Sequence, residues 1–148
     1  MARILVVDDD ASIRLVVRSI LERHGHVVEV AKTGHRGTEA VEAFSFDLAI
    51  VDIFMPDMDG LETIRAFRKS APTLPIIVMS GYAFRSIGGP PPDFFRMAMV
   101  LGASACLRKP FTPAQLMHVV QTCHDAPDLA ERKAAAAIHS GSDSSRSA

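Results

Sequence analysis

The sequence predicts an α/β fold: one doubly wound, five-stranded parallel sheet with helices on both faces. Five short aliphatic runs rich in β-branched residues show no alternation of apolar and polar positions, which is typical of strands covered on both faces. Amphipathic segments of helical period separate these runs, so that strand and helix alternate five times. Right-handed crossovers then place any functional crevice outside the carboxyl ends of the strands.

The expected strands lie at residues 3–7 (RILVV), 27–31 (VVEVA), 47–51 (DLAIV), 75–79 (PIIVM) and 105–108 (ACLR). The first helix is expected within SIRLVVRSILERHG, where one apolar stripe comprises Ile13, Val16, Val17, Ile20 and Leu21. Gly25 supplies its stop. Further helices are expected over about 36–44, 61–70 and 93–102, and from residue 112 onward. Asp93 and Thr112 are the expected N-caps of the last two helices, the second with Pro113 in its first turn.

Length and composition indicate one domain. A chain of 148 residues that is 48% hydrophobic and 22% charged can bury a core of its own. Residues 1–125 are expected to form this domain, and residues 126–148 a C-terminal extension that is partly helical and then disordered. From Ser140 onward the chain is rich in serine and glycine and offers little to bury.

Charge and cysteine content exclude several classes of partner. A formal net charge of −1 gives no general electrostatic reason to bind nucleic acid or an anionic membrane surface. The two cysteines, Cys106 and Cys123, form neither a disulfide framework nor a zinc pattern. No apolar run is long enough to span a bilayer. We therefore expect a soluble cytoplasmic protein.

Polar residues follow the predicted strands at one edge of the sheet. They are Asp8, Asp9 and Asp10 after the first strand, Asp52 after the third, Ser80 after the fourth and Lys109 after the fifth. Each of these acids taken alone is commonly a helix cap or a solvated loop residue. Together, the carboxylates repel one another unless a cation intervenes, and hard oxygen ligands in a hydrated cluster suit Mg²⁺. A lysine and a hydroxyl beside them complete a site for a phosphoryl group.

Four motifs carry a resemblance to a known family. They are ILVVDDDASIR, DLAIVDIFMPDMDGLETI, PIIVMSG and GASACLRKPF, in that order and each at the end of a predicted strand. In this respect residues 2–124 resemble the response-regulator receiver domain of two-component signalling, of the CheY-like type. The resemblance implies the flavodoxin-like fold already expected from the alternation of strands and helices.

The resemblance also implies roles for individual residues. Asp52 would be the phosphoacceptor, taking a phosphoryl group from phosphohistidine on a sensor histidine kinase or a histidine phosphotransfer protein. Asp9 and Asp52 itself would be ligands of Mg²⁺, and Asp8 would hold the ion largely through water. The main-chain carbonyl of Phe54 would supply a further oxygen, while Asp10 fills a variable position and is left out of the metal site.

Two further groups complete the implied site. Ser80 would donate to a phosphoryl oxygen after transfer, and Lys109 would pair with the phosphoryl group or with Asp52. The resemblance implies a cis Lys109–Pro110 bond, which is accessible because the second residue is proline. In a loose phosphoryl-transfer transition state, such groups act by alignment and by neutralising charge.

The chain departs from the family at three places. Cys106 stands three residues before the lysine, where the family has an aromatic ring that turns inward on activation. Phe54 and Tyr82, each two residues after a site residue, are bulkier than usual, and we expect them to shield the acyl phosphate from water or simply to cover the edge of the sheet. The segment from Gly81 to Pro92 is longer than the family norm by roughly half a dozen residues, against usual loop lengths of two to six.

The long segment has two interpretations. Its aromatic residues, or those that begin the fourth helix, could take over the readout that Cys106 cannot perform; the candidates are Tyr82, Phe84, Phe94 and Phe95. Alternatively, these phenylalanines only pack beneath the fourth helix.

Several functions remain to be weighed. The leading hypothesis is a stand-alone receiver that switches a downstream protein target; a shuttle in a phosphorelay is the alternative. We do not expect an enzyme, beyond assistance to its own phosphorylation and dephosphorylation. An Mg²⁺-dependent phosphohydrolase acting through an aspartyl phosphate is disfavoured, because enzymes of the haloacid dehalogenase type carry a second aspartate where this chain has Phe54. A docking module without phosphorylation is disfavoured by the complete set of site residues.

Overall fold

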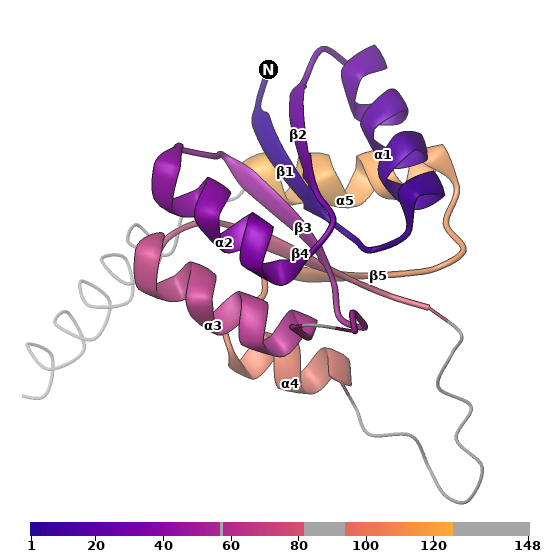
Figure 1. The fold of residues 1–148 in the computed structure, drawn as a ribbon. Coiled ribbons are helices and arrows are strands. Elements are labelled where there is room, and N and C mark those ends of the chain that lie inside the picture. The colour runs from indigo at the N-terminus through magenta and orange to yellow at the C-terminus, as the bar shows by residue number, and fades with distance from the viewer. Residues whose placement is uncertain (57, 82–93, 126–148) are drawn as a thin grey trace, which may run out of the picture.

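The computed structural model describes residues 1–56, 58–81 and 94–125. Five strands form one parallel sheet in the order β2-β1-β3-β4-β5 (Figure 1). The strands are β1 (Arg3–Val7), β2 (Val27–Ala31), β3 (Leu48–Asp52), β4 (Ile76–Ser80) and β5 (Ala105–Arg108). The helices are α1 (Ala11–Arg23), α2 (Gly34–Ala43), α3 (Gly60–Ser70), α4 (Phe94–Val100) and α5 (Pro113–Asp125). The predicted fold class is confirmed.

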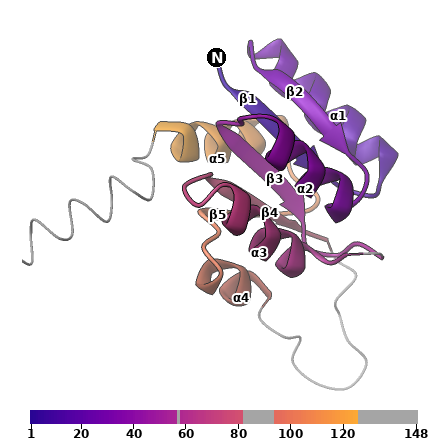
Figure 2. The same ribbon diagram turned by 60° about the vertical axis from the view of Figure 1, so that its left-hand side comes forward.

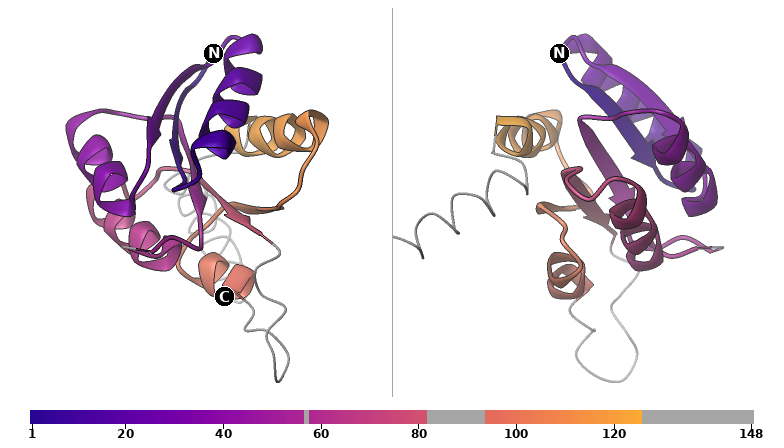
Figure 3. Two further views of the ribbon diagram at one scale, coloured as in Figure 1. Left: turned by 45° about the vertical axis from the view of Figure 1, so that its right-hand side comes forward. Right: turned by 90° about the vertical axis from the view of Figure 1, so that its left-hand side faces the viewer.

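The helices cover the sheet in two layers. On one face α1 and α5 pack against the sheet, and on the other α2, α3 and α4 do so (Figure 3). Helices α3 and α4 lie side by side, as the view in Figure 2 also shows. The largest buried side chains come from the three central strands, from Ile53 just after β3, and from the inward faces of α1, α3 and α5. One cluster of buried apolar side chains lies on each face of the sheet, and together they hold the carboxyl ends of neighbouring strands in fixed register.

Side-chain caps fix where the helices begin. Asp10 caps α1 by accepting from the backbone N–H of Ser12, at 2.9 Å. Thr33 caps α2 in the same way, so that helix begins two residues earlier than predicted. Thr112 is confirmed as a cap: its hydroxyl accepts from the N–H of Gln115, whose side chain accepts from the N–H of Thr112. The expected cap at residue 93 lies outside the described residues.

Three sequence predictions need correction. The third and fourth strands lie one residue later than predicted, because Asp52 and Ser80 still take part in the ladder opposite Met79 and Arg108. Val16 is 49% exposed and is not part of the buried stripe of α1. In β2, at the edge of the sheet, Val27 and Val30 are exposed as well, so the prediction that every strand is covered on both faces is wrong there.

The predicted C-terminal extension, residues 126–148, lies outside the described residues, as does the segment 82–93. In the part of the chain that the structure does describe, no helix combines the length and apolar character needed to traverse a bilayer.

Candidate functional site

The predicted site residues meet at the carboxyl edge of the sheet. Asp8 directly follows β1, Asp52 is the last residue of β3, Ser80 is the last residue of β4, and Lys109 directly follows β5. Because β1 and β3 are neighbours in the sheet, the first two carboxylates lie next to each other. The strand order therefore builds one site from four segments distant in sequence.

Three carboxylates form an acidic cluster, defined by Asp8, Asp9 and Asp52. Each offers one carboxylate oxygen, and these oxygens lie within 4.8 Å of one another. Asp8 is fully buried and Asp52 is 5% exposed, whereas Asp9 faces solvent. Hard oxygen donors that combine buried carboxylates with an open, hydrated side are the donor set that Mg²⁺ prefers. The residues present thus fit a divalent cation of this kind.

Lys109 lies among these carboxylates. Its Nζ is 2.6 Å from Oδ2 of Asp8 and 3.4 Å from Oδ2 of Asp52. Burial acts to lower the pKa of Lys109, but the hydrogen bond from its ammonium to Asp8 and the two nearby negative charges outweigh it, and the net shift is upward. Lys109 therefore stays protonated at neutral pH, and Asp8, rather than Asp52, is its closer partner.

The carboxyl group of Asp52 is held in an unfavourable environment for its ionised form. Burial and the neighbouring charge of Asp8 raise its pKa to about 6, from an ordinary value of 3.8. Lys109 and the N–H of Phe54, which donates to Oδ1 at 3.3 Å, oppose this rise without cancelling it. A cation at this position would relieve the repulsion between the two carboxylates.

Asp8 is positioned by one hydrogen bond to its side chain and one to its main-chain carbonyl. Its Oδ1 accepts from the backbone N–H of Asp10 at 2.9 Å, and its main-chain carbonyl accepts from Nη1 of Arg14 at 2.7 Å. The side chain of Asp10 caps α1, and the hydrogen bond from Ser12 lowers its pKa. Its engagement in the cap agrees with leaving Asp10 out of the metal site. Arg14 was missed by the sequence analysis, since a basic residue in the first turns of an amphipathic helix gives no distinctive signal.

The loop after β3 closes against the site through Gly60. Its N–H donates to the carbonyl of Ile53 at 2.7 Å. A Cβ at this position would lie 2.4 Å from the Cα of Ile53 and 2.5 Å from the carbonyl oxygen of Asp52. Only glycine fits this close approach, which explains the glycine that ends the DIFMPDMDG motif.

The remaining predicted residues line the rim. Ser80 is half-buried, and its carbonyl accepts from the N–H of Lys109 at 2.7 Å; the Lys109–Pro110 bond is cis, as expected. Phe54 is half-buried, and its ring meets that of Phe94 edge to face. Cys106 is half-buried on β5. Tyr82 and the segment that follows it lie outside the described residues.

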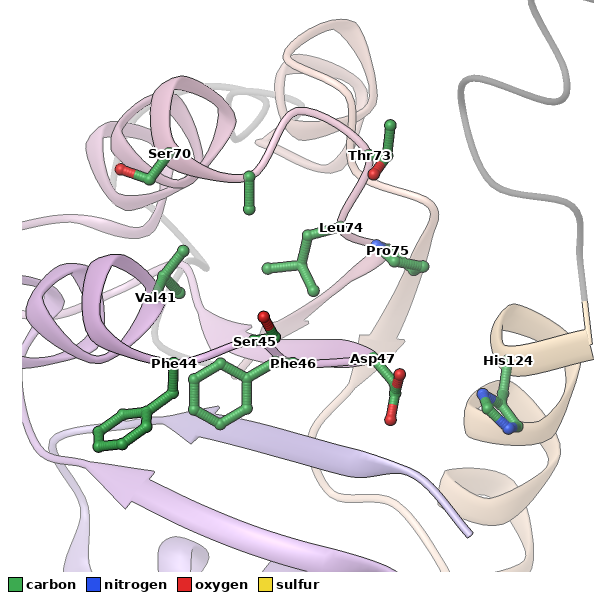
Figure 4. Close-up of a pocket in the computed structure, with 11 residues that line it drawn as sticks. Val41, Phe44, Ser45, Phe46, Asp47, Ser70, Thr73, Leu74, Pro75 and His124 are labelled. Atoms are coloured by element: carbon green, nitrogen blue, oxygen red, sulfur yellow. The ribbon is translucent and has the colours of Figure 1, made fainter.

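A separate groove of about 440 Å³ lies at the opposite edge of the sheet (Figure 4). It is formed by the loops that lead into β3 and β4, with Phe44, Phe46 and Leu74 on its walls and His124 from the end of α5. Its carboxylate, Asp47, accepts from the backbone N–H of Arg3. Among the described residues, the carboxylates that could hold a metal ion together lie at the carboxyl edge and not in this groove.

Comparisons with known proteins identify the family of the chain. Residues 4–121 match the response regulator receiver domain family. The transcriptional regulatory protein ZraR of Klebsiella oxytoca is 38% identical over 80 residues, which are 54% of this chain and 18% of that protein. The response regulator MprA of Mycolicibacterium vanbaalenii is 38% identical over 78 residues, 53% of this chain and 34% of that protein. The chain thus spans less than two thirds of these relatives.

Two solved structures are matched over nearly their whole length. A CheY-like response regulator receiver domain protein from Methanospirillum hungatei is 33% identical with a TM-score of 0.76, covering 84% of this chain and 94% of that one. The chemotaxis protein CheY4 of Vibrio cholerae is 31% identical with a TM-score of 0.73, covering 83% and 98% of the two chains.

Proposed function

Because the chain belongs to the response regulator receiver domain family, we propose that it accepts a phosphoryl group on Asp52 and thereby switches its interactions with other proteins. The observation that carries this proposal is the juxtaposition of a nearly buried carboxylate, Asp52, with two further carboxylates and the ammonium group of Lys109. The donor is a phosphohistidine on a sensor histidine kinase or a histidine phosphotransfer protein.

In the proposed reaction a carboxylate oxygen of Asp52 attacks the phosphorus atom of the phosphohistidine. The bond between phosphorus and the imidazole nitrogen breaks as the acyl phosphate bond forms, and the imidazole leaves with the bonding electrons. Asp52 must be ionised to attack, and its pKa of about 6 leaves it ionised at neutral pH. Its raised pKa also makes the carboxylate a better nucleophile than an ordinary surface aspartate.

The surrounding residues stabilise charge. Asp9 and Asp8, with the main-chain carbonyl of Phe54, would hold Mg²⁺, which supplies positive charge to the phosphoryl oxygens. Lys109 pairs with the incoming phosphoryl group, and Ser80, at the end of β4, donates its hydroxyl to a phosphoryl oxygen. Protein groups of this kind act in a loose transition state by orienting the reactants and offsetting their charge.

The output is proposed to be a protein contact. Helix α4 begins beside the site and exposes three large apolar side chains, Met97, Met99 and Val100. A phosphoryl group gives Ser80 and Lys109 new partners, and the fourth-helix face reports the change to a downstream target. Three points stay predictions. They are that the chain works without an attached output domain, that it could instead shuttle phosphoryl groups in a relay, and that the protein does not bind nucleic acid. The curated relatives extend well beyond the matched part.

Intact mass measurement after incubation with a small phosphodonor and Mg²⁺ tests the proposal. The wild type is expected to gain the mass of one phosphoryl group, and Asp52→Ala to gain none. Glu42→Gln, which removes an exposed carboxylate from α2, serves as a matched control and is expected to be phosphorylated like the wild type. A phosphate on Asp52→Ala, or none on the wild type, would overturn the proposal.

A truncated chain ending at Asp125 tests the proposed domain boundary. Residues 1–125 contain all the elements of the sheet and the complete acidic cluster. We expect this shorter chain to take up phosphate at the rate of the full chain. A loss of folding or of phosphorylation would place part of the extension within the domain.

A further inference from the structure

The phosphoacceptor and the fourth helix are linked by a pair of phenylalanine rings. Phe54 lies two residues after Asp52, and its backbone N–H donates to Oδ1 of the Asp52 carboxylate at 3.3 Å. The ring of Phe54 meets that of Phe94 in a T-shaped contact, with centroids 4.8 Å apart and an interplanar angle of 90°. Phe94 is the first residue of α4. One short path therefore runs from the carboxylate to the start of this helix.

The position of α4 depends on contacts of this kind. The helix has 7 residues, and of these Ala98 is buried. A helix this short is not stable in isolation and takes its place from tertiary contacts. At its first turn, the ring of Phe95 lies 5.6 Å from the guanidinium carbon of Arg108 on β5. At its far end, Arg68 of α3 donates to the carbonyl of Gly102.

The fifth strand carries a small side chain at the position where the family has an aromatic residue. Cys106 occupies the position on β5 where the receiver family has an aromatic residue, and its small side chain is half-buried. A thiol buries much less area than a phenyl ring, so its inward or outward position changes the free energy of α4 only slightly. The rings of Phe54 and Phe94, in contrast, contact each other directly.

We propose that the edge-to-face contact between Phe54 and Phe94 couples the state of Asp52 to the position of α4, in the role that an aromatic residue of the fifth strand has elsewhere in the family. Phosphorylation changes the oxygen that the Phe54 N–H contacts and adds phosphoryl oxygens beside the rim. The Phe54 backbone must adjust, and its ring carries that adjustment to Phe94. This inference rests on the proposed phosphorylation of Asp52.

A contact couples two sites only to the extent that its free energy differs between the two states. Aromatic pairs in this geometry contribute a free energy that corresponds to a factor of about two to ten in an equilibrium constant. Loss of the pair is therefore expected to reduce the effect of phosphorylation on α4 by about this factor.

Hydrogen exchange at the end of α4 measures the coupling. The amides of Leu101, Gly102 and Ala103 donate to carbonyls within α4, so their exchange reports opening of this helix. The quantity of interest is the ratio of exchange rates in phosphorylated and unphosphorylated full-length protein. We expect Phe54→Leu and Phe94→Leu each to reduce this ratio about two- to tenfold, and the double variant to reduce it no further than either.

Phe95→Leu is the matched control. It removes a ring from the same turn of α4, and that ring lies over the guanidinium group of Arg108 on β5 and not in the pair with Phe54. We expect faster exchange in both states and an unchanged ratio, which is the result for a merely structural residue. The inference is wrong if the ratio in Phe54→Leu and Phe94→Leu equals that of the wild type, or if Phe95→Leu lowers the ratio as much as they do.

Failure of the proposed function can be told apart from failure of this inference. If the wild type takes up no phosphate, the same amides are followed in unphosphorylated Asp52→Asn, which alters the charge that the Phe54 N–H contacts. The coupling then predicts that Asp52→Asn changes exchange in α4 in the presence of both rings, and changes it less in Phe94→Leu. Equal changes in the two backgrounds would refute the coupling whatever the phosphorylation result.

Discussion

Asp52→Asn is expected to stabilise the protein in the absence of Mg²⁺. Asp52 is 5% exposed and lies beside Asp8, which is fully buried. Burial and this neighbour raise the pKa of Asp52, so ionisation of the side chain opposes folding. Asparagine keeps the shape and an oxygen that can accept from the N–H of Phe54, but it removes the charge.

The magnitude follows from the pKa. In the folded protein the pKa of Asp52 is about 6, against an ordinary value of 3.8. At about 1.4 kcal/mol per unit, ionisation reduces the free energy of unfolding by at most about 3 kcal/mol. Because the folded-state pKa is raised, the loss is absent at pH values below the ordinary pKa. It grows as the pH rises toward the folded-state value and is complete above that value.

Urea unfolding at several pH values, in chelator, measures the effect. At pH values above 7, Asp52→Asn is expected to exceed the wild type in free energy of unfolding by about 1–3 kcal/mol. The difference should narrow by up to about 2 kcal/mol as the pH is lowered to about 4.5. Glu42→Gln, which removes an exposed charge, is expected to match the wild type throughout. Saturating Mg²⁺ should stabilise the wild type more than Asp52→Asn, because the ion offsets the repulsion only where the carboxylate remains.

A stability difference of zero at neutral pH, or one that does not change with pH, would falsify the view that Asp52 is an electrostatically strained carboxylate. If Asp52→Asn stabilises the protein by less than the expected amount but the difference still changes with pH as predicted, Lys109 offsets more of the negative charge of Asp52 than its pKa indicates.

Three further changes test other parts of the structure. Gly60→Ala is expected to lower the free energy of unfolding by about 2 kcal/mol or more, because the new Cβ would lie 2.4 Å from the Cα of Ile53. A free energy of unfolding in urea that lies within about 0.5 kcal/mol of the wild-type value, as for an ordinary surface substitution, would contradict this. Arg68→Ala is expected to cost about 1–3 kcal/mol, because it removes the charged donor to the carbonyl of Gly102, and thermal unfolding that matches the wild type would contradict it. Phe54→Asn is expected to shorten the lifetime of the acyl phosphate by about twofold or more, because a smaller polar side chain admits water; an unchanged rate of dephosphorylation would refute the shielding role.

Much of the site could be predicted because its residues follow strands. Each run of buried aliphatic residues fixes where a strand ends, and a parallel sheet brings all carboxyl ends to one edge. The convergence of Asp8, Asp52 and Lys109 was therefore accessible from the chain alone, and the structure places the carboxylates of Asp8 and Asp52 2.6 and 3.4 Å from Nζ of Lys109. The residue at which β3 ends could not be predicted from the sequence, because pairing with the neighbouring strand β4 decides it.

Other features depended on which elements become neighbours. The helical period placed Val16 in the buried stripe of α1. In the structure this side of the helix does not face the sheet, and Val16 is 49% exposed. The same holds for Val27 and Val30, whose strand lies at the edge of the sheet. Apolar character marks a residue that can be buried, and position in the sheet decides whether it is.

By itself, the sequence determined the class of fold, the order of its elements and the set of groups at the carboxyl edge. These depend on local periodicity and on residues adjacent to each strand. Tertiary structure decided that Lys109 lies closer to Asp8 than to Asp52, and that Phe54 meets Phe94. Side chains from segments far apart in sequence form these contacts, and their distances are set by strand order and helix packing, which no local pattern encodes.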